Sequence, residues 1–204
     1  MQHWLIALTV LVFLSACAHA SDTSALFEDS FDDARNGWTL TSNAQADVAI
    51  KSGQLFITVK KPDSLAWTTA KGKSFDNFTL DVDVTSLAGP DDNDYGVIVR
   101  HADDDNFYRF EISGDGYYNI QKRAKGKWEK LVPDWTPSHA IRKGRVTNHL
   151  RVTCAGDLMT FSVNQIQLAQ IQDTLSARGS IGLLVGTLTE PDVQVAFDNL
   201  KVTQ

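Results

Sequence analysis

The feature that most constrains this chain is the spacing of its apolar residues. From Phe27 onward they recur at every second position, and Gly, Asp, Asn or Pro interrupts the pattern about every eight to twelve residues. Successive side chains of a β-strand point to opposite faces of the sheet, so each segment has one face to bury. The sequence therefore predicts an all-β domain, a two-sheet antiparallel jelly-roll sandwich with about ten to fourteen strands.

Three successive segments in the middle of the chain, 95–100, 106–113 and 117–122, predict a meander joined by Asp- and Gly-rich turns. If Tyr108 and Phe110 point into the core, the intervening side chains share the opposite face. We expect that face to carry Ile98, Arg100, Phe107, Arg109, Glu111, Tyr117, Asn119 and Gln121.

The N-terminus has the composition of an export signal. Residues 1–16 contain no Lys, Arg, Asp or Glu, and the apolar run 4–14 is too short to span a bilayer. The run ends in Leu14-Ser15-Ala16-Cys17, which resembles the bacterial lipobox, where the Cys is acylated and becomes the mature N-terminus. We therefore expect a lipoprotein signal peptide at 1–16, a lipid-anchored tether at 17–26 and one domain at 27–204.

Lipidation at Cys17 would place the protein in the cell envelope, attached to the membrane through its lipid anchor only. Because Ala18 rather than Asp follows the Cys, the resemblance implies the outer membrane if the source is Gram-negative. Ala18-His19-Ala20 also matches an ordinary A-x-A cleavage site, so simple secretion is the alternative. If Cys17 is lipidated, Cys154 has no disulfide partner in the mature chain. We expect Cys154 to fill a small apolar slot on a strand.

Net charge excludes one class of partner. The formal charge is -6 and the pI is about 5.3, so the chain has no excess of basic residues with which to neutralise phosphates. We expect no nucleic acid partner.

Several segments together resemble a known fold family. They are GPDDNDYG at 89–96, NFYRFEIS at 106–113, DGYY at 115–118, ARGSIGL at 177–183 and AFDNL at 196–200. They are similar to the concanavalin A-like lectin and glucanase jelly roll, and the ending is similar to its laminin-G and keto-disaccharide-hydrolase-like members. The resemblance covers residues 27–202 and implies a superfamily of lectins, carbohydrate-binding modules and glycosidases, with ligands on the concave face of a sheet.

Glucanases of the resembling fold carry a Glu-x-Asp-x-x-Glu array, which this sequence lacks. Its nearest approach is Asp81 and Asp83, two carboxylates roughly 6 to 7 Å apart on one face of a strand. Because Thr79 and Thr85 flank them, we interpret the pair as the solvated side of an amphipathic strand. No Gly-x-Ser-x-Gly elbow and no Cys-x-x-Cys pair occurs.

The outward face of the meander is the better candidate site. Arg, Glu, Asn and Gln side chains beside aromatic rings can hydrogen-bond sugar hydroxyls and stack on sugar rings. The predicted ligand-binding residues are Arg100, Arg109, Glu111, Asn119, Gln121 and Phe107, with Trp128 and Trp135 as stacking platforms. The alternative is a cross-strand ion-pair ladder of Arg100, Arg109 and Glu111, in which each pair contributes up to ~1 kcal/mol. Trp67 shares strand parity with Leu65, and we expect it in the core.

Two acidic loops, 91–94 and 103–106, offer oxygen ligands of the kind that Ca²⁺ prefers. Asp103 and Asp105 are the candidate calcium ligands, although neither loop has EF-hand spacing and such runs also cap turns.

The leading hypothesis is therefore a non-catalytic glycan-binding module of an exported lipoprotein, with a polysaccharide or glycan-bearing partner. One alternative is a glycoside hydrolase or lyase of the same fold that uses Asp81 and Asp83 or Glu111. The other is a cell-envelope protein-interaction lipoprotein with no small ligand.

Overall fold

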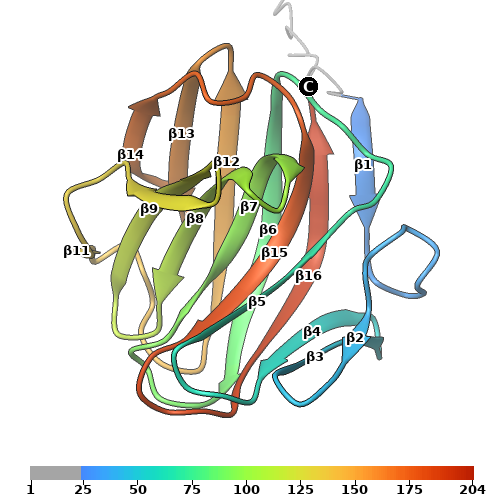
Figure 1. Ribbon diagram of the computed structural model, residues 1–204, viewed down its shortest axis with the longest axis vertical. Helices are drawn as coiled ribbons and strands as arrows, with labels where there is room; N and C mark the ends of the chain where they lie inside the picture. The colour runs from blue at the N-terminus through green and yellow to red at the C-terminus, as the bar shows by residue number, and fades with distance from the viewer. Residues whose placement is uncertain (1–23) are drawn as a thin grey trace, which may run out of the picture.

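The computed structural model describes residues 24–204, which form two antiparallel sheets packed face to face (Figure 1). The larger sheet contains β1 (Ala25–Asp29), β2 (Thr41–Ser42), β3 (Ala46–Lys51), β4 (Gln54–Val59), β6 (Phe78–Ala88), β12 (Thr147–Ala155), β13 (Leu158–Val163), β14 (Ile166–Gln172) and β16 (Val193–Thr203). The smaller sheet contains β5 (Ser64–Thr69), β7 (Asp94–Asp103), β8 (Asn106–Ser113), β9 (Tyr117–Ala124), β10 (Lys127–Lys130), β11 (Thr136–Pro137) and β15 (Ser180–Thr187).

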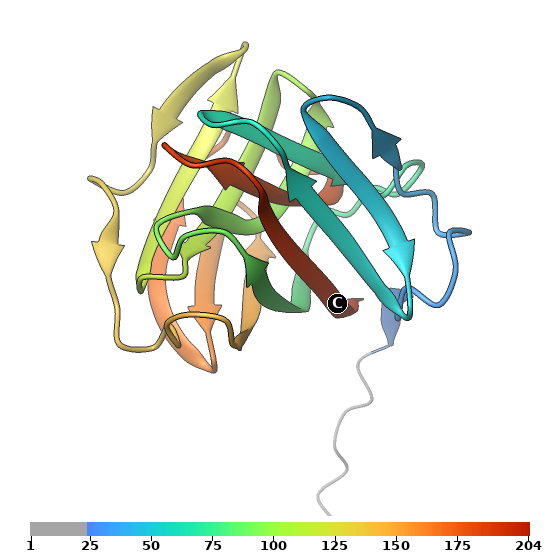
Figure 2. The same cartoon turned by 90° about the horizontal axis from the view of Figure 1, so that it is seen from below.

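The strand order is that of a jelly-roll sandwich. The nine-stranded sheet runs β14-β13-β12-β6-β16-β4-β3-β2, with β1 also paired to β16. The seven-stranded sheet runs β10-β9-β8-β7-β15-β5, with β11 also paired to β9. In Figure 2 the yellow strands β10 and β11 and the blue-to-cyan strands β2 to β4 lie on opposite sides of the molecule. The predicted fold class is confirmed, and two-residue strands such as β2 and β11 raise the strand number above the expected range.

Alternation builds the core between the sheets. Along β6 the inward positions Leu80, Val82 and Val84 are fully buried while the positions between them remain partly exposed. The two sheets meet at aromatic contacts such as Phe110 with Phe161, whose ring centroids lie 5.5 Å apart. Cys154 lies among these side chains as a free thiol, 1% exposed, as expected.

The predicted meander corresponds to β7, β8 and β9, which pair in that order. The hairpin between β13 and β14 turns through Asn164 and Gln165, with φ of 50° and 71°. Positive φ at both central residues is what a two-residue type I′ turn needs, so Asn-Gln takes the role that Asn-Gly would fill with less strain.

Strand β1 begins at Ala25, within the predicted tether, and Ala25 pairs with Thr203 of β16. The predicted signal peptide and Cys17 lie outside the described residues. Within residues 24–204 no helix is long and apolar enough to cross a membrane.

Candidate functional site

The register of the seven-stranded sheet assembles a continuous outer surface. One row of directly paired residues is Gln121, Arg109, Ile98, Gly182 and Thr69. The next row is Asn119, Glu111, Gly96, Leu184 and Trp67. The structure thus brings together four of the predicted ligand-binding residues. We call this surface, with Asp94, Phe107 and Trp128, the meander face.

Arg109 is the centre of the meander face. Its Nη2 donates to Gln121 Oε1 at 2.8 Å, and its Nε lies 3.2 Å from Glu111 Oε1. A third partner is the Asp94 carboxylate, at 3.8 Å from Nη1. The guanidinium also lies over the Trp128 ring, 4.2 Å from its centroid, in a cation–π contact. The Arg109 and Glu111 part of the predicted ion-pair ladder is therefore present.

Glu111 and Asn119 are polar residues buried on this face, and both are 0% exposed. The two Asn119 amide atoms have no hydrogen-bond partner among the described residues, while the Glu111 carboxyl contacts Arg109 and Asp94. Burial raises the pKa of Glu111 well above its usual value; the Arg109 charge lowers it, while the charge of Asp94 and a hydrogen bond with that carboxyl raise it further. Burial and Asp94 therefore favour the protonated form of the Glu111 carboxyl, and Arg109 opposes them.

Asp94 was not among the predicted site residues. It is 8% exposed, and its carboxyl occupies the space above Gly186 on the neighbouring strand, where a Cβ would lie only 2.2 Å from Asp94 Oδ1. Glycine at 186 is therefore what allows Asp94 to reach Arg109. The alternation could have found Asp94, because it has the same strand parity as Gly96 and Ile98.

Arg100 does not belong to the meander face, and its predicted place beside Arg109 is wrong. The pairing of β7 with β8 shifts between Val99 and Asp103, and Arg100 has a left-handed φ of 52°. This irregularity breaks the alternation and turns the side chain out of the face. Arg100 is 1% exposed and donates to backbone carbonyls of Ser176, Asp76 and Gly156. It holds three loop segments together.

Phe107 is fully buried, so the predicted direct contact with a ligand is wrong. It instead supports three rings, with centroid distances of 5.9 Å to Trp67, 5.4 Å to His101 and 5.6 Å to Trp128. Trp128 is 40% exposed and presents part of its surface to solvent.

Trp67 is half-buried on the outer surface and does not reach the main core, contrary to expectation. It does share parity with Leu65, but Ala66 packs on the main core and Thr68 is buried, so the inward positions of β5 are the even ones. The parity was correct and the assigned face was wrong. Trp135 lines a separate pocket of about 230 Å³ with Tyr117, Asp115 and Leu188.

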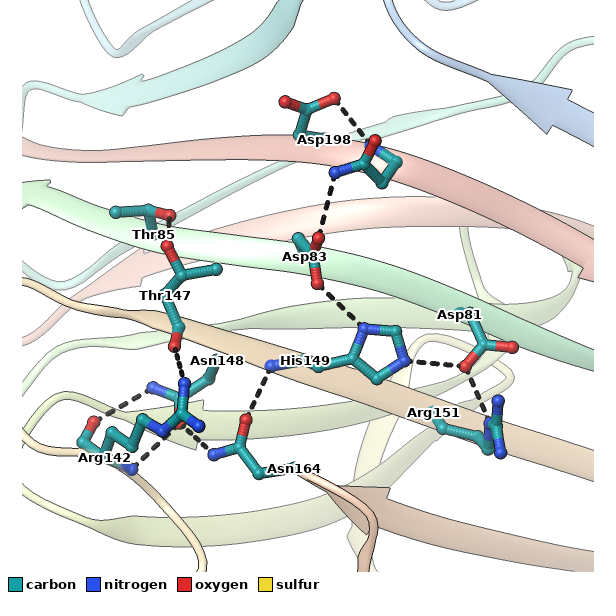
Figure 3. Close-up of polar contacts among 11 residues, drawn as sticks. Asp81, Asp83, Thr85, Arg142, Thr147, Asn148, His149, Arg151, Asn164 and Asp198 are labelled. Carbon is teal, nitrogen blue, oxygen red and sulfur yellow. Dashed lines mark hydrogen bonds and ion pairs between the residues drawn. The ribbon is translucent and has the colours of Figure 1, made fainter.

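The outer face of the nine-stranded sheet holds Asp81 and Asp83 (Figure 3). His149 lies between them, with Nε2 2.8 Å from Asp81 Oδ1 and Nδ1 2.8 Å from Asp83 Oδ1. Asp81 also accepts from Arg151 Nε at 2.7 Å, and Asp83 accepts from Asn199 Nδ2 at 3.0 Å. Both carboxylates therefore bond to neighbouring side chains of this outer face.

Asp103 and Asp105 hold the β7–β8 turn. Asp103 Oδ1 accepts from Asn106 Nδ2 and from the Asp105 backbone N–H, both at 2.8 Å, and these bonds lower the pKa of the Asp103 carboxyl. Asp105 Oδ1 lies 3.4 Å from Arg123 Nη2. In the described part of the chain no group of three or more His, Cys, Asp or Glu side chains is placed to hold a metal ion. Calcium binding by Asp103 and Asp105 stays a prediction.

Comparison with known families now bears on this site. The model of the 3-keto-alpha-glucoside-1,2-lyase-like domain matches residues 23–203, which is nearly the whole chain. The chain belongs to this family. The match begins just before β1 and ends within β16, so the family domain and the sandwich coincide.

Several solved structures share the fold of this 3-keto-alpha-glucoside-1,2-lyase-like domain. The carbohydrate-binding module CBM66 from Bacillus subtilis is 18% identical, with a TM-score of 0.66 over 83% of this chain and 96% of that chain. A Bacillus licheniformis beta-glucanase is 8% identical, with a TM-score of 0.65 over 89% and 99%. A Bacillus subtilis protein of unknown function with a galectin-like fold is 11% identical, with a TM-score of 0.61 over 89% and 96%.

These likenesses show the fold. The domain is a concanavalin A-like jelly roll of the kind found in carbohydrate-binding modules and glycosidases. Comparison with curated protein sequences finds no match.

Proposed function

We propose that the protein is a non-catalytic glycan-binding module and that its ligand lies on the meander face. The observation that carries the proposal is the single constellation around Arg109, in which a positioned guanidinium and the Gln121 amide lie beside the partly exposed ring of Trp128. Aromatic rings stack on the apolar faces of sugars while oriented polar groups bond the hydroxyls, and these are the two contacts that a glycan needs.

Burial of the carboxyls supports binding over hydrolysis. Both carboxyl oxygens of Glu111 are inaccessible, so they cannot touch a glycosidic bond in this arrangement. Glu111 and Asp94 are also hydrogen-bonded to each other. The two carboxyls of a glycosidase stand at least about 5 Å apart so that a sugar or a water fits between them.

A lyase of the same fold is the second candidate, and one observation favours it. The family description names a lyase, and Glu111 is a carboxyl whose pKa is raised by burial, as a general acid requires. Incubation of the purified protein with 3-keto-glucosides, followed by chromatography, tests this candidate. Product formation that Glu111→Gln abolishes would establish the lyase and displace the binding module.

The binding proposal is tested by affinity electrophoresis and calorimetry against soluble and insoluble polysaccharides, including xylan and β-glucan, with and without a chelator. We expect retention by at least one polysaccharide and its loss in Trp128→Ala. Ile166→Ala removes a comparably exposed apolar side chain from β14 in the other sheet and serves as the control. Equal retention of both variants would contradict the proposed site, and loss of retention only with chelator present would support the calcium prediction.

We further propose that a lipid on Cys17 displays the domain at the cell envelope. The lipobox-like Leu14-Ser15-Ala16-Cys17 supports this. Metabolic labelling with a fatty acid should mark the wild type and leave Cys17→Ala unlabelled. An unlabelled wild type recovered from the medium would indicate simple secretion.

A further inference from the structure

A pocket of about 590 Å³ lies at the β5 edge of the meander face. Trp67 and Thr69 of β5 form one side, and His101 and Asp104 from the end of β7 and its turn form another. Lys71, which follows β5, also lines it. The pocket thus combines a half-buried indole ring with hydroxyl, ammonium, imidazole and carboxylate groups.

The polar groups of this pocket are little used inside the protein. His101 Nε2 contacts Asp104 Oδ1 at 3.2 Å, but the Thr69 hydroxyl, the Lys71 ammonium and the Trp67 indole N–H have no hydrogen-bond partner within residues 24–204. Their hydrogen-bonding capacity is therefore free for a ligand or for water. A pocket of about 510 Å³ on the other sheet, lined by His149 and Arg151, differs because those side chains already bond to Asp81 and Asp83.

The pocket and Arg109 lie on the same row of paired residues. Thr69 and Arg109 belong to one row of paired residues, separated by Gly182 and Ile98. Three strand spacings place their backbones roughly 14 Å apart. Gly182 contributes no side chain, and Thr69 and Ile98 occupy the space that a Cβ there would take.

Aromatic contacts join the same two ends. Phe107 is buried between Trp67, which lines the pocket, and Trp128, which lies beneath the Arg109 guanidinium. The two partly exposed indoles are therefore held in a fixed relation by one buried ring.

We propose that this pocket is a second sugar subsite and that the ligand is an oligosaccharide chain lying across the strands. One sugar contacts Trp128 and Arg109, and another, further along the chain, contacts Trp67, Thr69 and Lys71. A ligand that contacts Thr69 and Lys71 at one end and Arg109 at the other must extend across a backbone span of roughly 14 Å, so we expect the module to recognise several sugars along a chain and not a terminal residue alone. This inference rests on the proposed glycan-binding function.

The test measures affinity against chain length by calorimetry. The probes are xylan and β-glucan oligosaccharides from monosaccharide to hexasaccharide. The proteins are the wild type, Lys71→Ala, Thr69→Val and Trp128→Ala, with Lys61→Ala as the control because Lys61 is also exposed and lies outside the pocket lining. Thermal unfolding of each variant checks that it folds.

We expect wild-type affinity to rise about tenfold or more between the disaccharide and the longest oligosaccharides. Lys71→Ala and Thr69→Val should remove much of that rise and leave disaccharide binding unchanged, whereas Trp128→Ala should weaken short and long ligands alike. Wild-type affinity that is equal for all lengths, or equal weakening of all lengths by Lys71→Ala, would overturn the second subsite while leaving glycan binding intact. Failure of the wild type to bind any glycan would overturn both proposals.

Discussion

The two outer faces of the sandwich are built from strands of the same alternating kind, yet they treat polar side chains differently. On the nine-stranded sheet, Asp81, Asp83, His149 and Arg151 bond to one another across β6 and β12. On the seven-stranded sheet, Glu111 and Asn119 are fully buried, and the Asn119 amide has no hydrogen-bond partner within residues 24–204. The partly exposed Trp67 and Trp128 lie on the same outer face.

The difference distinguishes a supporting surface from a binding surface. A partly exposed set of ion pairs contributes little stability and offers little to a ligand, because its donors and acceptors are already used. Buried polar groups without partners cost stability, and their presence in a folded domain calls for a functional explanation. The predictions below test this contrast, beginning with the largest expected effect.

Arg109→Ala should lower both stability and binding. It leaves Asp94 and Glu111 side by side without their cation, and breaking a buried pair in this way typically costs about 3–5 kcal/mol. Chemical denaturation measures the loss. The double variant Arg109→Ala/Asp94→Asn should recover part of the stability without recovering glycan binding. A single variant as stable as the wild type would mean that Arg109 does not balance these carboxyls.

Glu111→Gln should change how stability depends on pH. Because the folded-state pKa of Glu111 is raised, the folded protein keeps this proton over a pH range in which the unfolded chain has released it. The stabilising effect is complete below the ordinary pKa of about 4.3 and is lost as pH rises through the folded-state value.

The amide of Glu111→Gln cannot ionise, so the variant should be more stable than the wild type at high pH, by about 1–3 kcal/mol, and similar to it at pH 4. Thermal unfolding across pH measures the difference. Identical pH profiles for the two proteins would show that Glu111 does not titrate abnormally.

Trp128→Ala should reduce glycan affinity about tenfold, ~1.4 kcal/mol, with a small effect on the unfolding temperature because the ring is 40% exposed. Paired calorimetry and thermal unfolding separate these effects. A large drop in unfolding temperature would indicate that the ring is mainly structural.

His149→Ala should have the smallest effect. Its side chain is 38% exposed, and removing its contacts with Asp81 and Asp83 should change the free energy of unfolding by about 0–1 kcal/mol. Glycan affinity should stay unchanged. Weaker glycan binding in this variant would place the ligand on the outer face of the nine-stranded sheet and contradict the proposed difference between the two faces.

Local periodicity was sufficient to predict the sheets and most of the candidate site. Arg109, Glu111, Asn119 and Gln121 meet as expected because β8 and β9 pair without interruption. The direction of the Arg100 side chain was not predicted. Arg100 itself has a left-handed φ where the β7–β8 pairing is irregular, and no glycine at that position marks the irregularity in the sequence.

Aromatic residues were harder to place than charged ones. Trp67 obeys the alternation, but parity alone does not say which side of a strand is the core. Phe107 lies on the expected outer face and is buried there by neighbouring rings. The burial of Phe107 depends on three rings from β5, β7 and β10, and such long-range packing is not visible in local sequence.

The fit of Asp94 over Gly186 has a consequence for recognising this arrangement elsewhere. Any side chain at 186 would expel the carboxyl from its place, so the two positions can change only together. Relatives that have arginine at the position of Arg109 and aspartate at the position of Asp94 should also have glycine at the position of Gly186. A relative with a bulky residue at the position of Gly186 should have a different ligand preference, even if it retains the arginine at the position of Arg109.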